Sequence, residues 1–342
     1  MKAYDFVYGE FDIPDIIDPL VFAPEFQRLS NVRLLNTNSP TLSSLSEITR
    51  YSHTIGVLRL ALLNSSIMMS SDEYIAFLAA VILHDVGTPA YAHLLEYQLN
   101  QRFGWNHEST AFAITNGTHH TDGVNTQLFQ DLPADYESLC KKCGIDFGIV
   151  QSIIAKEHPS HRLLFGSLDL DNLDNVVRMA IAIGHPLDLR KVIKLAENIG
   201  FSNTGCTVLS RDLEDCVQYW ASLRETVYRV LVFDSCTVSR QAVLSRCIRL
   251  ALNSGELDQS DWIYNDSELI RVLEQTGPRM KSMIHRDFKS EPPALCLLCH
   301  IDRQVSEFLA KFTPESIVSH ICLLYTSPSP RDRTRSRMPS SA

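Results

Sequence analysis

The chain has 342 residues, of which 45% are hydrophobic, and carries 31 basic against 40 acidic side chains, a formal net charge of −9. This composition describes a globular protein able to bury a full core, and it excludes a disordered or membrane-embedded chain. This excess of acidic side chains argues against a surface that binds nucleic-acid phosphates. No nucleic-acid partner is therefore expected.

The sequence shows neither a membrane-spanning segment nor a signal peptide. No apolar run reaches the roughly 18 residues of a spanning helix. The N-terminus M-K-A-Y-D-F also lacks the apolar core of a signal peptide. We therefore expect no membrane association and a cytoplasmic location.

The nine cysteines are then expected to be free thiols. Two close pairs, Cys140 with Cys143 and Cys296 with Cys299, leave other interpretations open. Together they could form a zinc site, and the second pair, followed by His300, matches a c-type haem attachment string. Haem attachment requires export, and the zinc pairs are far apart in sequence, so we favour small apolar thiols on buried helix sides.

Helical periodicity dominates the chain. The first residues predict at most a small N-terminal hairpin, and a Ser/Thr/Asn/Pro-rich loop is expected over 36–46. Helices are expected over 24–35, 55–63, 72–84, 90–102, from 105, and over 147–156, 173–183, 188–198, 213–232 and 240–253. The stretch 116–136 is loop-like and could form a lid. No alternating strand series and no repeat is visible, so the predicted fold class is all-α.

Two segments divide the chain in this prediction. Residues 1–322 form a single helical domain with a C-terminal helical extension. Residues 323–342, rich in Ser, Pro and Arg, have no apolar periodicity. That composition is typical of a disordered tail or of a sequence artefact, so it takes no part in the functional argument.

The central feature is the apolar run 75–83, which ends in the adjacent pair His84-Asp85. Ser70 and Glu73 form the sequence pattern of a capping box, so this helix is expected to begin near Ser71. A histidine and an aspartate at the buried end of a helix need partners. A pair standing alone would most simply be a neutral core histidine bonded to a capping aspartate.

Two further residues change this interpretation. His53 lies upstream in R-Y-S-H-T-I-G-V, and Asp171 lies downstream in L-D-L-D-N-L-D-N. With His84 and Asp85 they supply two nitrogen and two oxygen ligands. Such a set suits a divalent transition metal (manganese, iron, zinc or cobalt) and leaves coordination positions open for water and substrate.

At this point the chain resembles the HD-domain phosphohydrolases, which are named for this H…HD…D ligand set. D-F-V-Y-G, P-E-F-Q-R-L, R-Y-S-H-T-I-G-V, H-D-V-G-T-P-A-Y-A-H and W-N-H-E-S follow one another. The same order is found in the deoxynucleoside-triphosphate triphosphohydrolase (dGTPase-like) branch. The resemblance implies an all-α HD-type helical bundle that hydrolyses a nucleotide, and it makes a homo-oligomer plausible.

The resemblance also implies roles for the metal ligands. His53, His84, Asp85 and Asp171 would hold the metal, with magnesium possible on the substrate phosphates. Asp171, rather than Asp169 or Asp174, is assigned because the first Asp of the family pattern D-x-x-D is the ligand. A bound metal lowers the pKa of water, so that hydroxide can attack phosphorus near neutral pH.

Further residues match the branch's catalytic and phosphate-binding positions. His93 is assigned as the general acid, His107 as a second histidine along the phosphates, and Glu96 as the acid that orients both. Arg50 matches a phosphate-contacting arginine, and Arg224 is a second, loosely aligned candidate.

The departures from the branch concern the substrate. Thr88 replaces a usual histidine, Leu34 a glutamine that reads the sugar, and Asn175 and Met179 a tyrosine and an aspartate that hold the deoxyribose. Two alternatives therefore stay open: a phosphohydrolase acting on a nucleoside monophosphate or another phosphoester, and a non-catalytic nucleotide-sensing module.

Overall fold

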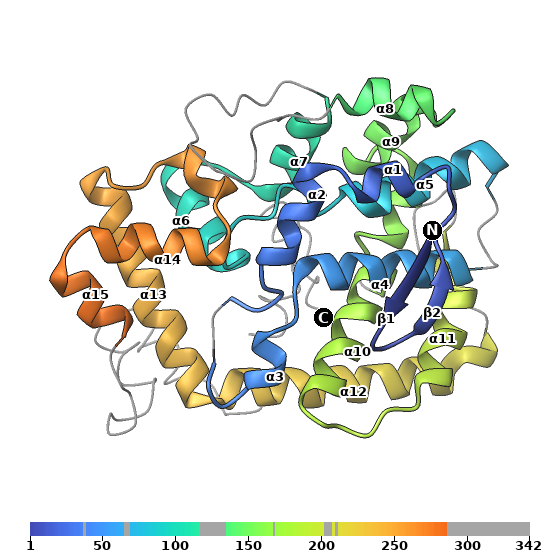
Figure 1. Ribbon diagram of the computed structural model, residues 1–342. Helices are drawn as coiled ribbons and strands as arrows, with labels where there is room; N and C mark the ends of the chain where they lie inside the picture. The colour runs from blue at the N-terminus through green and yellow to red at the C-terminus, as the bar shows by residue number, and fades with distance from the viewer. Residues whose placement is uncertain are drawn as a thin grey trace, which may run out of the picture.

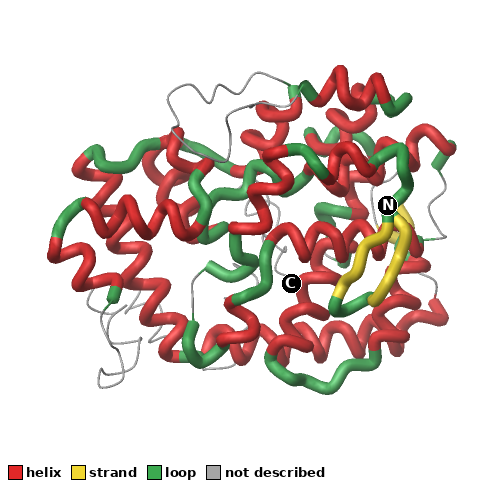
Figure 2. The backbone as a smooth tube through the Cα atoms, in the orientation of Figure 1, coloured by secondary structure: helices red, strands yellow, loops and turns green. Residues whose placement is uncertain are grey.

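The computed structural model describes residues 1–36, 39–64, 69–116, 135–166, 168–201, 207–208 and 211–285. Most of the predicted lid, the pair Cys296–Cys299 and the tail 323–342 lie outside the described residues. Within these residues there are fifteen α-helices and two two-stranded sheets. The all-α prediction is confirmed, with the expected hairpin at the N-terminus (Figures 1 and 2).

The strands are β1 (Lys2–Asp5), β2 (Gly9–Asp12), β3 (Gly200–Phe201) and β4 (Thr207–Val208), paired antiparallel as β1–β2 and β3–β4. The first helices are α1 (Asp18–Val21), α2 (Pro24–Arg28), α3 (Ser43–Ser46), α4 (Arg50–Leu63), α5 (Ser71–Leu83), α6 (His93–Phe103), α7 (His107–Thr115) and α8 (Tyr136–Lys142). The others are α9 (Phe147–Ile154), α10 (Leu170–Ala182), α11 (Leu189–Asn198), α12 (Glu214–Phe233), α13 (Ser235–Ser254), α14 (Asp266–Gln275) and α15 (Pro278–Ile284). The β3–β4 pairing was not expected.

Helices α4, α5, α9 and α10 form the centre of the core. Helix α5 packs against α4 and α9, and α4 packs against α10. The capping box of Ser70 and Glu73 starts α5 as predicted, and every residue from Ala76 to Leu83 is buried. Because α5 is apolar on all sides, it runs through the core and delivers His84 at its C-terminal cap.

Close contact between α4 and α10 depends on Gly56. A Cβ atom at this position would lie 1.9 Å from Asp174 Oδ1 and 2.0 Å from Arg178 Nη2. Both neighbours are fully buried, so they have little room to move. The missing side chain therefore sets the distance between the two helices.

Several predicted helix boundaries were wrong; α4 and α13, for example, each begin five residues before their predicted starts at 55 and 240. The helix predicted over 24–35 ends at Arg28 and continues only as a 3-10 turn, Leu29–Asn31. Beyond it the chain is extended, because the Leu34 N–H donates to Ile48 O (2.9 Å) and Val32 O accepts from the Arg50 N–H (2.8 Å). The helix predicted from 90 begins at His93, because the two residues before it have positive φ angles.

C-terminal helices pack against α6. Helix α13 packs against α6, α14 and α15, and the 3-10 turn Gln259–Ile263 also packs against α6 (Figure 1). No helix in the described part of the chain combines the length and the apolar character needed to cross a membrane.

Candidate metal centre and active site

Three helices bring the four predicted metal ligands together. His53 lies in α4, His84 caps α5 with Asp85 directly after it, and Asp171 lies in the first turn of α10. Asp171 Oδ1 is 2.8 Å from His53 Nε2 and 3.4 Å from His84 Nε2. Asp85 Oδ2 is 3.9 Å from His84 Nε2, and ligand atoms of His53, Asp85 and Asp171 all lie within 4.8 Å of one another.

The Nδ1 atoms of His53 and His84 each have a hydrogen-bond partner outside the metal site. His53 Nδ1 lies 2.7 Å from the Asp174 carboxylate, and His84 Nδ1 lies 2.7 Å from the carbonyl oxygen of Val81. Each Nδ1–H therefore donates, and each Nε2 is directed at Asp171, where a metal ion can replace the Nε2 proton. Two imidazole Nε2 atoms and two carboxylates converging on one point fit a divalent metal ion, and a carboxylate behind a histidine is a common support for such a ligand.

The electrostatics of the site favour a positive charge. Burial alone lowers the pKa of His53, but the carboxylates of Asp171 and Asp174 outweigh it and raise the pKa to about 9. Burial alone raises the pKa of Asp171, but His53 and His84 hold it well below its usual value. A cation at this point would satisfy the histidines and carboxylates together.

A buried ionic network supports His53 from behind. Arg178 Nε donates to Asp174 Oδ2 (2.6 Å), and Arg178 Nη2 donates to Asp5 Oδ2 (2.8 Å). The guanidinium carbon of Arg178 also lies 5.2 Å and 5.8 Å from the ring centroids of Phe6 and Tyr8. The N-terminal hairpin thus closes over the same carboxylate that orients the His53 ring.

Asp85 is held from two sides. Arg50 Nη1 lies 3.2 Å from Asp85 Oδ2, and the Thr88 hydroxyl donates to Asp85 Oδ1 at 3.0 Å. Burial raises the pKa of Asp85, but Arg50 and then His84 lower it below its usual value. Thr88, at the position where the branch that the sequence resembles usually has a histidine, therefore fixes the carboxylate.

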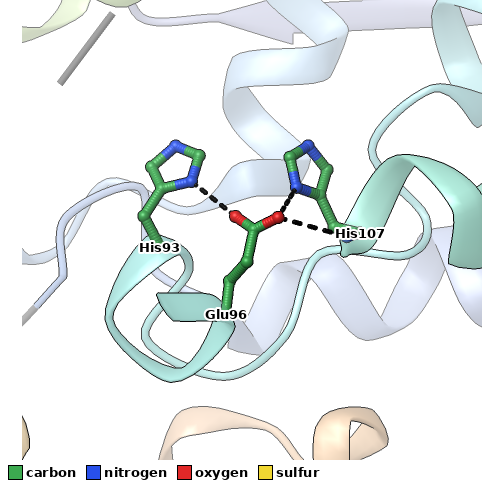
Figure 3. Close-up of side chains that lie close together, drawn as sticks. All are labelled: His93, Glu96 and His107. Atoms are coloured by element: carbon green, nitrogen blue, oxygen red, sulfur yellow. Dashed lines mark hydrogen bonds and ion pairs between the residues drawn. The ribbon is translucent and has the colours of Figure 1, made fainter. Parts of the chain in front are cut away.

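His93, Glu96 and His107 form a second cluster, on α6 and α7 (Figure 3). The Glu96 carboxylate receives His93 Nδ1 at 2.8 Å on Oε2 and His107 Nδ1 at 2.6 Å on Oε1. The backbone N–H of His107 also donates to Oε1 (3.2 Å). Both rings therefore direct Nε2 away from Glu96, as Figure 3 shows.

Glu96 and His107 shift each other's pKa. Burial lowers the pKa of His107, but Glu96, helped by Glu108, raises it to about 9. Burial raises the pKa of Glu96, but His107 and His93 hold it well below its usual value. Glu108 is itself paired with Lys156, whose Nζ lies 2.8 Å from Oε1.

Gly87 connects the two clusters. A Cβ atom at Gly87 would lie 2.3 Å from the carbonyl oxygen of His107 and 2.6 Å from Ala111 N. The turn after Asp85 is therefore in direct contact with the start of α7, which carries His107.

A cavity of about 100 Å³ lies between the clusters. Six of the predicted site residues line it: Arg50, His84, Asp85, His93, His107 and Asp171. The residues that lack a predicted site role are Glu108, Leu164, Phe165, Asp169, Asn172, Asn175 and Tyr228. His53 and Glu96 lie behind the cavity wall, bonded to residues that form it.

Arg224 is not among the described residues that line the cavity. Its guanidinium carbon lies 4.9 Å from the Tyr228 ring centroid and 5.7 Å from the Trp220 ring. Tyr228, one helical turn after Arg224 on α12, lines the cavity in its place. Nothing in the sequence marks Tyr228 or Phe165 as a cavity residue.

Three positions stand where the branch that the sequence resembles has sugar-binding residues. They are divided between the hydrophobic core and the cavity. Leu34 and Met179 are buried in the hydrophobic core, with 6% and 3% exposure. Asn175 lines the cavity, one turn after Asp171 on α10.

No protein-family model matches the chain. Over 200 residues it is 23% identical to a protein of Dictyostelium discoideum named deoxynucleoside triphosphate triphosphohydrolase SAMHD1 homolog, covering 53% of this chain and 36% of that protein. Over 249 residues it is 22% identical to the uncharacterized protein YwfO of Bacillus subtilis (strain 168), covering 69% of this chain and 52% of YwfO. The aligned parts therefore span about half or less of these relatives.

Among solved structures, a phosphohydrolase from Bacteroides thetaiotaomicron superposes with a TM-score of 0.56 and 19% identity. The match covers 94% of this chain and 76% of that protein. The chain shares the fold of a phosphohydrolase. At this identity the likeness concerns the fold, and the chemistry has to be argued from the side chains.

Proposed function

We propose that the chain is a metal-dependent phosphohydrolase of the HD type that acts on nucleotides, most simply as a deoxynucleoside-triphosphate triphosphohydrolase. One observation carries the proposal. The ligand atoms of His53, His84, Asp85 and Asp171 converge beside a cavity whose other wall presents His93 and His107. Metal-dependent phosphoester hydrolysis uses a metal donor set and a proton donor, and residues able to serve as each border this cavity.

The four ligands would hold a divalent metal such as manganese, iron, zinc or cobalt. When bound, such an ion polarises a phosphoryl oxygen and lowers the pKa of water. Arg50 supplies a cation at the cavity wall, where it already pairs with Asp85, and can contact substrate phosphate. Arg224 would act on the substrate only through Tyr228, which it contacts.

Proton donation is assigned to His93. Glu96 accepts the Nδ1–H of His93, so the ring is held in one orientation with Nε2 available to the departing oxygen. His107, bonded to the other oxygen of Glu96, adds positive charge beside the phosphates.

The nucleotide assignment is supported by the name of the Dictyostelium relative and by the order of the sequence motifs. The sugar-binding residues of that branch are replaced by Leu34, Asn175 and Met179. A pocket that forms few hydrogen bonds to the sugar discriminates weakly against analogues that lack a hydroxyl. Hydrolysis of 2′,3′-dideoxynucleotides is therefore expected within about tenfold of the deoxynucleotides, which corresponds to about 1.4 kcal/mol.

The deciding experiment is a screen of nucleoside tri-, di- and monophosphates with metal-replete protein, resolving phosphate from triphosphate as products. Release of triphosphate from deoxynucleotides supports the proposal. Hydrolysis of monophosphates alone would move the assignment to another phosphoester. Tight nucleotide binding with no turnover, whichever of these metals is supplied, would favour a sensing module and end the catalytic proposal.

A further inference from the structure

The turn before His93 has an unusual backbone. Tyr91 has φ +52° and Ala92 has φ +47° with ψ −124°. Both residues are buried and neither is a glycine. Left-handed backbone is unfavourable for residues with a Cβ atom, and it persists only where surrounding contacts fix it.

One buried carboxylate supplies such a contact. Asp266, the first residue of α14, is fully buried, and its Oδ1 accepts the backbone N–H of Tyr91 at 2.7 Å. Its Oδ2 accepts from the backbone N–H of Arg33 (3.0 Å) and from Arg33 Nη1 (3.2 Å). Hydrogen bonds to a charged acceptor in a buried site are stronger than neutral ones.

Arg28 makes a second connection between the same two segments. Its Nη1 donates to the carbonyl oxygens of Ile263 and Tyr264 (3.3 and 3.2 Å), just before α14. Its Nη2 donates to the carbonyl oxygens of Val86 (3.2 Å) and Thr88, in the turn after Asp85. The segment at the beginning of α14 is therefore held to the turn between Asp85 and His93 at two places: through Arg28 near the start of the turn and through Asp266 near its end.

We propose that Asp266 is a positioning residue for His93: by holding the Tyr91 N–H it fixes the strained turn that sets where the His93 ring lies in the cavity. This inference rests on the proposed function, in which His93 donates the proton. The ring follows Ala92 directly, so a rotation about the Ala92 backbone would displace it. A displacement of about 1 Å at a reacting group costs roughly a hundredfold in rate.

The test uses the dependence of rate on the leaving group. An ester with an alcohol leaving group needs a proton from His93, whereas the 4-nitrophenyl ester of the same phosphate group leaves without one. Asp266→Asn replaces one accepting oxygen by an amide nitrogen, so the Tyr91 and Arg33 donors cannot all be satisfied. It should lower kcat on the alcohol ester by roughly 10–100-fold and on the 4-nitrophenyl ester by less than about threefold, with metal content unchanged.

The matched control is Glu268→Ala, on the same helix. Glu268 Oε2 accepts the Asn265 N–H at 2.9 Å and closes the capping box of α14, but no hydrogen bond joins it to Tyr91 in the described structure. This variant weakens the start of α14 and should leave both esters near the wild-type rate. Equal losses on both esters in Asp266→Asn, or the same loss in Glu268→Ala, would reduce Asp266 to a general structural role and overturn the inference.

Hydrogen exchange of the Tyr91 amide gives a second test that needs only the wild-type chain. The inference requires protection comparable to the amides of α5, and exchange as fast as a surface amide would overturn it even if Asp266→Asn does not fold. The two proposals also fail differently. A wild type that hydrolyses neither ester contradicts the proposed function, while the Tyr91 amide still decides whether Asp266 holds the turn.

Discussion

The two clusters beside the cavity use the same residue types in different surroundings. In the first cluster (His53, His84, Asp85 and Asp171, the metal half), His53 and His84 are almost completely buried, and both nitrogens of each ring have a hydrogen-bond partner. In the second cluster (His93, Glu96 and His107, the acid half), the His93 side chain is 48% exposed. Of its two ring nitrogens, only Nδ1 has a hydrogen-bond partner in the described structure. Burial with directed lone pairs suits a held ion, whereas an exposed ring with one free nitrogen suits proton exchange with solvent.

On the proposed function, the two clusters divide ion binding from proton transfer within one cavity. Each half can be disabled separately, and the consequences should differ in kind. Loss of the metal half removes the ion and the reaction together, while loss of the acid half leaves the ion in place.

The largest effect is expected from Asp85→Ala and His84→Ala. Wild-type protein should contain about one transition-metal ion per chain, and both variants should lose the metal and all measurable hydrolysis. Elemental analysis with an activity assay checks this, and Asp72→Asn, in the exposed first turn of α5, is the control. A metal-free wild type that still hydrolyses nucleotides would contradict the division.

His93→Ala should come next. It should keep its metal but lose roughly 10²–10⁴-fold in kcat, the usual contribution of general acid catalysis. Measurement of kcat beside metal content checks this, with Gln101→Ala at an exposed position of α6 as the control. Near-wild-type turnover in His93→Ala would mean that the exposed ring is only a surface residue.

Gly56→Ala tests how the metal half is supported. The added methyl group would displace Asp174 and Arg178, so the chain should lose about 1–3 kcal/mol of stability. The metal affinity should fall roughly 10–100-fold, because Asp174 orients His53. Denaturant unfolding and metal titration measure both, and Gly148→Ala, whose Cβ would meet only the exposed Asp146 at 3.2 Å, should show neither loss.

The smallest effect concerns pH and the acid half. The pKa of His107 is raised from 6.5 to about 9 in the folded chain. Its ion pair with Glu96 therefore stabilises the fold fully below about pH 6.5 and loses this contribution as the pH rises through about 9.

The stability difference between wild type and His107→Gln should thus be larger at pH 5.5 than at pH 10, by about 1–3 kcal/mol. Denaturant unfolding of both proteins at the two pH values measures it. A difference that grows with pH would show that the two groups are not paired.

Local features of the chain were predictable from sequence. His84 and Asp85 are adjacent, His93 and Glu96 are one turn apart, and the capping box of Ser70 spans four residues. Short-range helical geometry settles such relations. The all-α class follows from the same periodicity.

Contacts between distant segments were not predictable. Asp266 and Tyr91 are 175 positions apart, and nothing in the local sequence marks Tyr91 or Ala92 as left-handed, since neither is a glycine. Tyr228 replaces Arg224 at the cavity because the rotation of α12 is set by packing against α10 and α11. Packing decides which side of a helix meets a site, and a single sequence does not record it.

The hairpin that closes over Arg178 also constrains the order in which the protein can form. Asp5 and Arg178 are 173 positions apart, so their ion pair cannot exist until α10 has been synthesised. At about 5–20 residues per second, ribosomal synthesis separates the two by on the order of ten seconds or more. Asp171 and Asp174 arrive in that same late helix. The last of the four proposed metal ligands and the carboxylate behind His53 therefore arrive together, and capture of an ion would report that folding has reached α10.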